Sequence, residues 1–510
     1  MKGDFWGSSP GLDSIMATEA APFGLLPHNP YFSSALQKVE ARGAKVLEVS
    51  KSYKGAWGIG GFGMTIQRPR GTRDFLPVES FRRGAVRRRM QELMERWGYS
   101  EVSTPTFEHL ELFTIKSGPS IIDEIYAFKD KGGRDLALRP ELTAPVMRMY
   151  VSELQKSPKP LRLHYFGNCF RYERPQRGRF REFWQLGAEL IGSDRPDSEA
   201  EVIALAQGLI KSAGVSGDLH LGYLGLIRAM MRRIPATERP AVMRLIDKKE
   251  RGLLAEKLQE IGRDHLGLAE LIDLKGRSAL NRAMELAEDL AGGAEDLTSE
   301  AAAGTREAAF PDGGGDRAGR DDRAAPTDLD FGRFRELVDL LEVYGVEATV
   351  DFEIVRGLEY YTGTVFEIYA SGLGAQNQIC GGGTYMLAGL LGGQETRSTG
   401  FGIGFDRIME IVDLEERPPA PVAVVFVPLV RAEAVKAAKE LRDGVAVPVV
   451  LDVMGRGLGA QLKQASSIGA SYAVIIGPKE VEEGKFTLRE MSTGSQESLG
   501  LMEIIERLSK

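Results

Sequence analysis

The 510-residue chain has few of the side chains that bind metals or form disulfides. It contains 2 cysteines, Cys169 and Cys380, which are far apart in the sequence, and 5 scattered histidines. These numbers exclude a disulfide framework and a zinc site built from thiolates or histidines. A GxGxxG-like fragment at residues 58–63 lacks a surrounding strand, turn and helix, so we expect no dinucleotide or other organic cofactor.

Long apolar runs are also missing. No stretch approaches the roughly 20 apolar residues of a membrane-spanning helix, and the sequence after Met1 has no signal-peptide pattern. We therefore expect a soluble, cytoplasmic protein without membrane contact. The formal net charge of −7 excludes a uniformly basic coat for nucleic acids, but it leaves room for a local basic groove.

What the chain does have is a concentration of arginine in one short stretch. Residues 170–183 read FRYERPQRGRFREF and lie between two strand-like runs, 161–170 and 184–191, with Pro175 and Gly178 at the turn. Guanidinium groups bind phosphate oxygens through paired hydrogen bonds and remain charged, so this hairpin is suited to a polyphosphate. The alternative is a surface hairpin whose charges are solvated.

Side-chain alternation along these two strands predicts a polar floor. The outgoing strand should direct into the core the side chains of Trp184, Leu186, Ala188 and Leu190. Its opposite face carries Phe183, Gln185, Gly187 and Glu189. The matching face of the incoming strand carries Gly167, Cys169, Arg171 and Glu173. If the two polar faces form one floor, an arginine, two carboxylates and an amide lie there beside an aromatic ring.

Composition divides the chain into regions. Residues 1–65 are rich in Gly, Ser and Pro, so we expect a flexible extension, with Met64 as a possible start. Periodic patterns predict a folded core at 66–217 and 330–415. Between them we expect a helical insertion at 218–329. Within it, residues 291–327 are mainly Ala, Gly, Asp and Arg, which predicts disorder.

Within the core, apolar periodicity predicts helices at 80–97, 143–152 and 198–213 and strands at 101–107 and 136–140, followed by a mostly helical stretch at 220–290. The first helix also carries a charged face of Arg82, Arg83, Arg87, Arg88 and Arg89. This face is either solvated or a contact for nucleic acid.

After a proline-rich linker at 417–421, short strands and helices alternate. We expect strands at 422–427, 448–453 and 472–476 and helices at 432–442, 458–468 and 501–508. This order predicts a compact α/β domain at 418–510 with a largely parallel sheet.

Four further segments carry unusual polar or glycine residues. Glu141, in the segment LRPELT at 138–143, lies at a helix start and could cap that helix or hold a substrate ammonium. The segment RGLEYYTGTVFE at 356–367 has adjacent tyrosines, of which only one should enter a pocket because neighbouring strand residues face opposite ways. The run CGGGTY at 380–385 allows close backbone approach, or it is a loop.

The fourth segment, TGFGIGFDRIM at 399–409, is typical of a glycine-spaced strand that turns into a helix. Arg407 lies in the first turn of that helix, where the helix dipole disfavours a cation. A ligand phosphate at this position would remove the conflict.

From about Gln67 to the C-terminus, these segments resemble the histidyl-tRNA synthetases, a family of class II aminoacyl-tRNA synthetases. Residues 170–173 with their loop resemble the second class-defining motif, and residues 402–407 resemble the third. Residues 356–361 are more specific, since they resemble the family's histidine-recognition signature, and residues 139–143 resemble its amino-acid loop.

The resemblance implies ATP-dependent activation of L-histidine, with Mg²⁺ accompanying ATP, and transfer to histidine tRNA by a homodimer. It implies a fold with an α+β catalytic core containing an antiparallel sheet of the class II synthetase type, a helical insertion and a C-terminal α/β domain that binds the anticodon. The ATP-binding residues implied are Arg171, Glu173, Arg179, Phe183 and Arg407. Those for histidine are Glu141, Thr143, Arg171, Gln185, Glu189, Arg356, Tyr360 and Tyr361. The catalytic residues implied are Arg356, Arg171 and Arg407.

Two other functions fit parts of the sequence. One is a non-catalytic, histidyl-synthetase-like regulatory subunit of ATP phosphoribosyltransferase. The C-terminal α/β domain and the intact signature at 356–367 favour the enzyme. The other is a class II synthetase for glycine or threonine, against which the paired tyrosines and Glu189 argue. The sequence departs from the family after its triple glycine, where Thr384 and Met386 stand in place of the usual arginine and aspartate.

Overall fold

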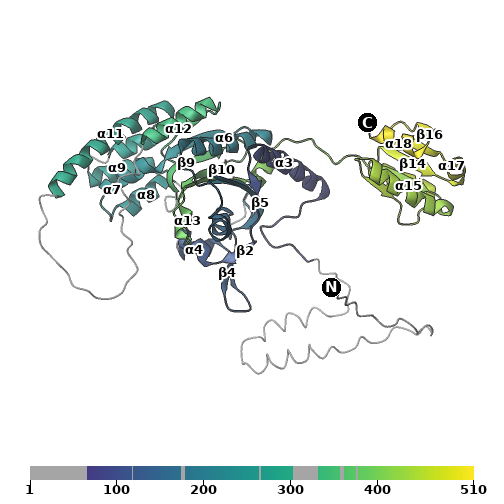
Figure 1. Cartoon of the computed structure of the whole chain (residues 1–510), viewed down its shortest axis with the longest axis horizontal. Helices are drawn as coiled ribbons and strands as arrows, with labels where there is room; N and C mark the ends of the chain where they lie inside the picture. The colour runs from purple at the N-terminus through teal and green to yellow at the C-terminus, as the bar shows by residue number, and fades with distance from the viewer. Residues whose placement is uncertain are drawn as a thin grey trace, which may run out of the picture. The chain divides into compact units, whose positions relative to one another are not determined.

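The computed structural model describes residues 66–117, 119–173, 179–247, 249–262, 266–301, 331–355, 361–374 and 377–509 (Figure 1). Every element described below lies in one compact unit, Arg68–Lys510. The predictions for residues 1–65 and for 302–327 of the insert lie outside the described residues. Over the ranges just given, no helix is both long enough and apolar enough to cross a membrane.

An eight-stranded sheet carries the candidate site. Its strands, in spatial order, are β1 (Ser100–Glu101), β5 (Leu161–Phe170), β6 (Glu182–Ile191), β11 (Ser398–Gly404), β10 (Gln378–Tyr385), β9 (Tyr361–Tyr369), β7 (Asp218–Tyr223) and β8 (Thr349–Val350). From β5 to β7 all neighbours are antiparallel, and only the two edge strands pair in parallel. The predicted hairpin is confirmed as β5 and β6, because period-two alternation and a turn signal are both local features.

The two faces of this sheet are covered differently. Helices α3 (Pro77–Arg96) and α6 (Pro196–Ser212) pack on one face, where Leu186, Ala188 and Leu190 join their apolar side chains in one core (Figure 1). The other face carries α4 (Glu111–Ser117), the 3-10 helix η1 (Pro119–Glu124), α5 (Thr143–Met149), its π-helical continuation η2 (Tyr150–Leu154) and α13 (Leu387–Leu390). The predicted core face of β6 is therefore confirmed.

The predicted strand at 101–107 is wrong, because its two ends join different sheets. Glu101 pairs with β5, whereas Phe107 begins β2 (Phe107–His109) in a three-stranded sheet with β4 (Asp135–Leu138) and β3 (Ala127–Lys129). Between them, the carbonyls of Thr104 and Pro105 accept hydrogen bonds from the buried Arg139 guanidinium at 2.7 and 3.2 Å. These carbonyls therefore have a side-chain partner in place of a neighbouring strand.

The helical segment begins later than the sequence indicates. Residues 218–223 form β7, where Leu219, Leu221 and Tyr223 are buried and the backbone pairs with β9. The helices that follow are α7 (Leu224–Arg233), α8 (Arg239–Asp247), α9 (Arg251–Ile261), α10 (Leu266–Asp273), α11 (Gly276–Ala301) and, after the insert, α12 (Phe331–Val343). The backbone of α11 thus continues into the stretch predicted to be disordered.

These helices share a core with the large sheet. Leu254, Leu258 and Leu271 from α9 and α10 belong to the same buried cluster as Leu221 of β7 and Phe334 of α12. An insertion that folded on its own would have its own core. The helical segment is therefore packed as part of the unit that contains the large sheet.

The arginine-rich face of α3 has several partners within the chain. Arg82 Nε donates to the backbone carbonyl of Glu416 at 3.2 Å, and Arg87 pairs with Glu101 at 3.4 Å. Arg83 is buried and bonded to Asp406. Arg83 is therefore not part of a solvated face, whereas Arg87 remains partly exposed. A contact of this helix with nucleic acid stays a prediction.

The C-terminal residues form a mixed five-stranded sheet. Its order is β13 (Val449–Leu451), β12 (Val422–Phe426), β14 (Tyr472–Ile476), β15 (Phe486–Glu490) and β16 (Gln496–Leu499). It is accompanied by the 3-10 helix η5 (Pro428–Val430) and by α15 (Arg431–Gly444), α16 (Leu458–Ser467), α17 (Pro478–Glu483) and α18 (Leu501–Leu508). The first three strands are parallel as predicted, whereas β15 and β16 add an antiparallel hairpin. The hairpin was missed because its exposed edge strand, QESL, lacks apolar alternation.

Candidate active site

A cavity of about 520 Å³ opens beside the polar face of β5 and β6. The sequence-predicted site residues that line it are Glu141, Thr143, Arg171, Glu173, Arg179, Phe183, Gln185, Tyr361 and Arg407. Glu189 does not line the cavity but lies beneath it, fully buried. Arg356 and Tyr360 fall outside the described residues.

The hairpin supplies the floor of this cavity. In the β5–β6 register Cys169 lies opposite Phe183 and Gly167 lies opposite Gln185, so the two polar faces do form one surface. Arg171 Nε donates to the carbonyl of Pro140 at 3.0 Å, and its guanidinium carbon lies 5.2 Å from the centre of the Phe183 ring. The alternative of a solvated surface hairpin is therefore ruled out for Arg171.

A second arginine of the hairpin is paired within the cavity. Arg179 Nη1 lies 3.2 Å from Glu173 Oε2, and both side chains are about one-third exposed. Such a partly exposed pair contributes little stability, of the order of 1 kcal/mol or less. A phosphate could therefore replace Glu173 as the partner of the Arg179 guanidinium at a small cost in free energy.

Glu189 is the centre of a buried polar network. Tyr165 donates its hydroxyl proton to Glu189 Oε1 at 2.9 Å, and Tyr385 donates to Oε2 at 2.5 Å. Gly400 lies directly opposite Glu189 on β11, and a Cβ at that position would overlap the carboxylate. The glycine-spaced strand predicted at 399–404 thus makes room for this side chain.

Burial raises the pKa of Glu189 to about 7, because it disfavours the carboxylate more than the two hydroxyl donors favour it. Burial, together with the neighbouring carboxylate, also raises the pKa values of Tyr165 and Tyr385 well above the ordinary range. Both tyrosines therefore remain neutral hydrogen-bond donors, whereas the raised pKa lets Glu189 be protonated more readily than an exposed glutamate.

Tyr165 connects this network to the cavity. Tyr165 lines the cavity, and its hydroxyl lies 3.4 Å from Thr143 Oγ1 and 2.9 Å from Glu189 Oε1. Sequence reasoning missed Tyr165, although the period-two face that held Gly167, Cys169 and Arg171 extends to it. Tyr385 was also missed as a site residue, because its partner is 196 positions away in the sequence.

Glu141 caps a helix and also lines the cavity. Its carboxylate accepts hydrogen bonds from the backbone N–H of Ala144 at 3.1 and 3.2 Å, so it caps the first turn of α5. The same side chain lines the cavity. Capping is thus observed, and contact with a substrate ammonium stays a prediction.

The strand–helix turn predicted at 399–409 is confirmed as β11 followed by α14 (Phe405–Ile411). Arg407, in the first turn of α14, donates a hydrogen bond to the backbone carbonyl of Gln378 from β10. Gln378 Nε2 in turn donates to Glu367 at 2.8 Å, and both residues line the cavity. Glu367 lies an even number of positions after Tyr361 in β9 and therefore shares its strand face. This alternation could have identified Glu367 as a site residue from the sequence.

Asp406 holds the hairpin, α14 and α3 together. Its Oδ1 accepts from Arg73 at 2.5 Å and from Arg83 at 2.8 Å, and its Oδ2 accepts from the backbone N–H of Trp184 at 2.6 Å. The residue is 2% exposed. Sequence reasoning named its neighbour Arg407 and overlooked Asp406, which fixes the helix on which Arg407 stands.

The triple glycine is part of a strand, so the loop alternative for 380–385 is wrong. It lies in β10 between β9 and β11. A Cβ at Gly382 would meet the carbonyl of Gly400 and the ring of Phe366, so close backbone approach requires glycine there. Among the described residues, no group of three or more His, Cys, Asp and Glu side chains could hold a metal ion.

The family is decided by comparison with known proteins. The family model described as histidyl-tRNA synthetase matches residues 71–309 and 320–408. A histidine–tRNA ligase from Methanosarcina acetivorans is 51% identical over 451 residues, which cover 88% of this chain and 99% of the relative. This chain belongs to the histidyl-tRNA synthetase family. A second histidine–tRNA ligase, from Archaeoglobus fulgidus, is 47% identical and covers 85% of this chain and 97% of its own length.

Two further comparisons describe the parts of this histidyl-tRNA synthetase family member. A family model for an anticodon binding domain matches residues 422–510. A crystal structure from Bacillus halodurans, named as an ATP phosphoribosyltransferase regulatory subunit/histidyl-tRNA synthetase, is similar with a TM-score of 0.64 and 26% identity over 82% of this chain and 99% of that one. The predicted fold class, an antiparallel class II core with helices and a C-terminal α/β domain, is confirmed.

Proposed function

We propose that this chain activates L-histidine with ATP to histidyl-adenylate and then transfers histidine to histidine tRNA. One observation carries the proposal. Arginines from the hairpin and from α14 line the same cavity as Tyr165, which is hydrogen-bonded to the buried Glu189. A polyanion and a small polar group could therefore bind side by side.

Adenylate formation suits this arrangement. The carboxylate of the amino acid is already a nucleophile, so the enzyme needs to bring two anions together and to stabilise charge on phosphorus. Arg171, Arg179 and Arg407 are the described cations for this role, and Arg356 is proposed to approach the carboxylate and the α-phosphate. Glu173 and Phe183 would hold the adenine. Mg²⁺ enters with ATP as part of the substrate.

Histidine recognition is proposed to rest on the Glu189 network. Tyr165 and the Tyr360–Tyr361 pair would present polar partners to the imidazole nitrogens, and the buried Glu189 would act on the imidazole through its hydrogen bond with Tyr165. Glu141, Thr143 and Gln185 would surround the α-amino group. A pocket that bonds both nitrogens leaves its own groups unpaired when another amino acid enters, and such a pocket can discriminate strongly.

The domain assignment follows from the same proposal. The catalytic core would consist of residues 66–217 and 330–415 together with β7. Residues 418–510 would bind the anticodon. We further propose a cytoplasmic homodimer. The match to an anticodon-binding model supports the synthetase over the regulatory subunit, which usually lacks this domain.

Amino-acid-dependent exchange of pyrophosphate into ATP tests the proposal. Each of the standard amino acids is offered in turn, with Mg²⁺ and ATP, to the purified chain. Histidine alone should support exchange. Equal exchange with a second amino acid would show that the cavity is not selective, and absence of exchange with histidine would favour a regulatory role.

A further inference from the structure

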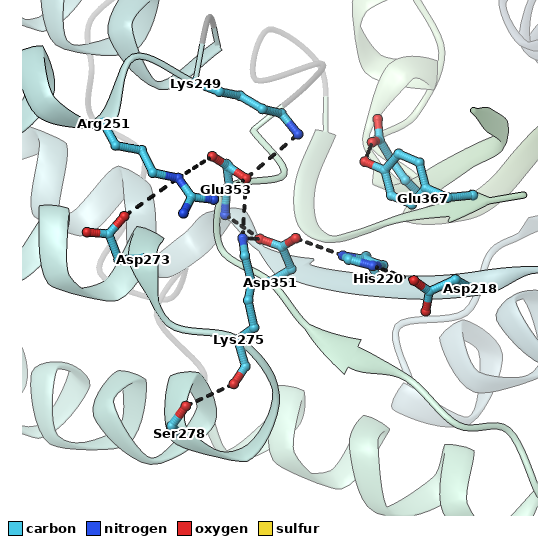
Figure 2. Close-up of polar contacts among 11 residues, drawn as sticks. Asp218, His220, Lys249, Arg251, Asp273, Lys275, Ser278, Asp351, Glu353 and Glu367 are labelled. Atoms are coloured by element: carbon cyan, nitrogen blue, oxygen red, sulfur yellow. Dashed lines mark hydrogen bonds and ion pairs between the residues drawn. The ribbon is translucent and has the colours of Figure 1, made fainter. Parts of the chain in front are cut away.

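Two buried carboxylates follow directly after β8, at the junction of the large sheet with the helical segment (Figure 2). Asp351 is 5% exposed and Glu353 is 8% exposed. Lys249, Arg251 and Lys275, which lie at or next to the starts of helices α9 and α11, form ion pairs with one or both of these carboxylates. We call the five residues Asp351, Glu353, Lys249, Arg251 and Lys275 the anchor cluster.

Both carboxylate oxygens of Asp351 have hydrogen-bond partners. The Lys275 ammonium donates to Oδ1, which also accepts from the backbone N–H of Glu353 at 2.9 Å. His220 of β7 shares a hydrogen bond of 2.8 Å with Oδ2. Burial raises the pKa of Asp351. The hydrogen bonds from His220 and Lys275 outweigh this effect and lower the pKa to about 2. The aspartate is therefore ionised at neutral pH.

Glu353 is bound by three cations. Arg251 approaches it with both arms of its fork, Nε to Oε1 at 3.0 Å and Nη2 to Oε2 at 3.1 Å. Lys275 lies 3.3 Å and Lys249 lies 3.7 Å from Oε2, as Figure 2 shows. The paired geometry of Arg251 fixes direction as well as distance.

The cations are placed where the helices themselves do not favour them. Arg251 is the first residue of α9, and Lys275 immediately precedes α11. The positive end of the helix dipole disfavours a cation at each of these sites. Asp351 and Glu353 offset this cost at both helix starts. The cluster therefore serves the contact between the helical segment and residues 351–353.

Residues 351–353 are followed directly by a residue of the cavity wall. Ile354, the next residue, lines the cavity. On the far side of residues 356–360, Tyr361 also lines the cavity, and its backbone carbonyl accepts a hydrogen bond of 2.5 Å from Arg228 Nη2 of α7. The helical segment thus contacts the chain on both sides of the stretch that contains Arg356.

We propose that the helical segment positions this wall of the active site, through the anchor cluster at Ile354 and through Arg228 at Tyr361. Asp351, Glu353, Arg251 and Arg228 are then positioning residues for histidine activation. This inference rests on the proposed function, since it assigns no separate reaction. It makes the helical segment a working part of the catalytic core and not only an addition to it.

Two variants test the two contacts separately. Glu353→Gln removes one of the two negative charges of the anchor cluster, and Arg228→Gln removes the donor to the Tyr361 carbonyl. The control is Arg282→Gln, which breaks ion pairs of 3.0 and 2.7 Å with Glu270 and Glu285 inside the same helical segment. Histidine-dependent ATP–pyrophosphate exchange is measured for each at a temperature where circular dichroism shows all proteins folded.

We expect Glu353→Gln and Arg228→Gln each to lower kcat about tenfold or more, because displacement of reacting groups by about 1 Å can cost ~10²-fold in rate. The KM for ATP should change little. The control should keep its kcat. In a double variant, Arg251→Gln should add little to the loss caused by Glu353→Gln, because the two residues act as one pair.

The outcomes separate the two proposals. Unchanged kcat in both variants, with a wild-type protein that exchanges with histidine, would overturn the positioning role and leave the proposed function standing. An equal loss in Arg282→Gln would overturn it too, because the effect would then reflect general weakening of the helices. A wild-type protein that does not exchange with histidine would overturn both. If Glu353→Gln does not fold, Arg228→Gln decides alone.

Discussion

Glu189 and Asp351 are both buried carboxylates, yet their pKa values are shifted in opposite directions. Two neutral hydroxyls, from Tyr165 and Tyr385, bind Glu189, and burial raises its pKa to about 7. Lys275 and His220 bind Asp351, and its pKa is lowered to about 2. Burial alone therefore does not determine charge, because the charge of the partners also shifts the pKa.

This difference matches the places of the two groups in the fold. A carboxyl group beneath a cavity, with a pKa near neutral pH, can be protonated or ionised according to the charge of the bound ligand. A permanently ionised carboxylate among cations is suited to holding segments together. The first belongs to the proposed recognition of histidine, and the second to the anchor cluster.

The largest expected effect is on stability at the anchor cluster. Asp351→Asn leaves Lys275 and His220 beside a neutral side chain in a buried site. Loss of one partner from a buried pair costs several kcal/mol, and because Lys275 is partly exposed we expect about 3 kcal/mol. Urea unfolding followed by circular dichroism measures this change. A loss below about 1 kcal/mol would mean that the cations are as stable without their carboxylate as with it.

A somewhat smaller effect is expected on binding at Glu189. Glu189→Ala removes the carboxylate that accepts from the buried hydroxyls of Tyr165 and Tyr385, which should cost roughly 2 kcal/mol or more in selection of histidine. The kcat/KM for histidine in pyrophosphate exchange measures it. Glu189→Gln is the matched control, since it keeps one acceptor oxygen and the side-chain volume. The assignment fails if alanine is tolerated as well as glutamine.

The smallest effect is a difference in pH dependence. The folded pKa of Glu189 is raised from an ordinary 4.5 to about 7, so its contribution to stability is complete below pH 4.5 and is lost as pH rises through 7. The folded pKa of Asp351 is lowered from 3.8 to about 2, so its contribution is complete above pH 3.8 and is lost as pH falls through 2.

Thermal unfolding of each protein over this pH range checks the two signs. Relative to wild type, Glu189→Gln should become more stable as pH rises from 5 to 8. The stability difference between Asp351→Asn and wild type should instead shrink as pH falls from 3.8 towards 2, because the wild-type aspartate becomes protonated there. The contrast between the two carboxylates breaks down if both variants follow the same pH profile.

How much the sequence could predict also differs between the two regions. The hairpin floor, with Arg171, Phe183 and Gln185, followed from period-two alternation and a turn signal, which are local. The same alternation implied that Glu189 belongs to that face. It could not imply the buried position of Glu189, because Tyr385 comes from β10 and the space comes from Gly400.

The anchor cluster gave no signal in the sequence. Lys275 and Asp351 are separated by 76 positions, and Arg251 and Glu353 by 102. Charged residues at helix starts and after a short strand look like ordinary surface residues until the fold brings them together. The same reason explains β7, whose alternating Leu219 and Leu221 were assigned to a helical stretch because their partner β9 lies far along the chain.

The central claim is that this cavity selects histidine through the Glu189 network. The most direct test compares pyrophosphate exchange for wild type and Glu189→Ala, with histidine and with a panel of the other amino acids. We predict exchange with histidine alone in the wild type, and a fall of about 30-fold in kcat/KM for histidine in the variant, which corresponds to roughly 2 kcal/mol. Exchange of wild type with another amino acid at a similar rate, or an unchanged kcat/KM in the variant, would contradict this account.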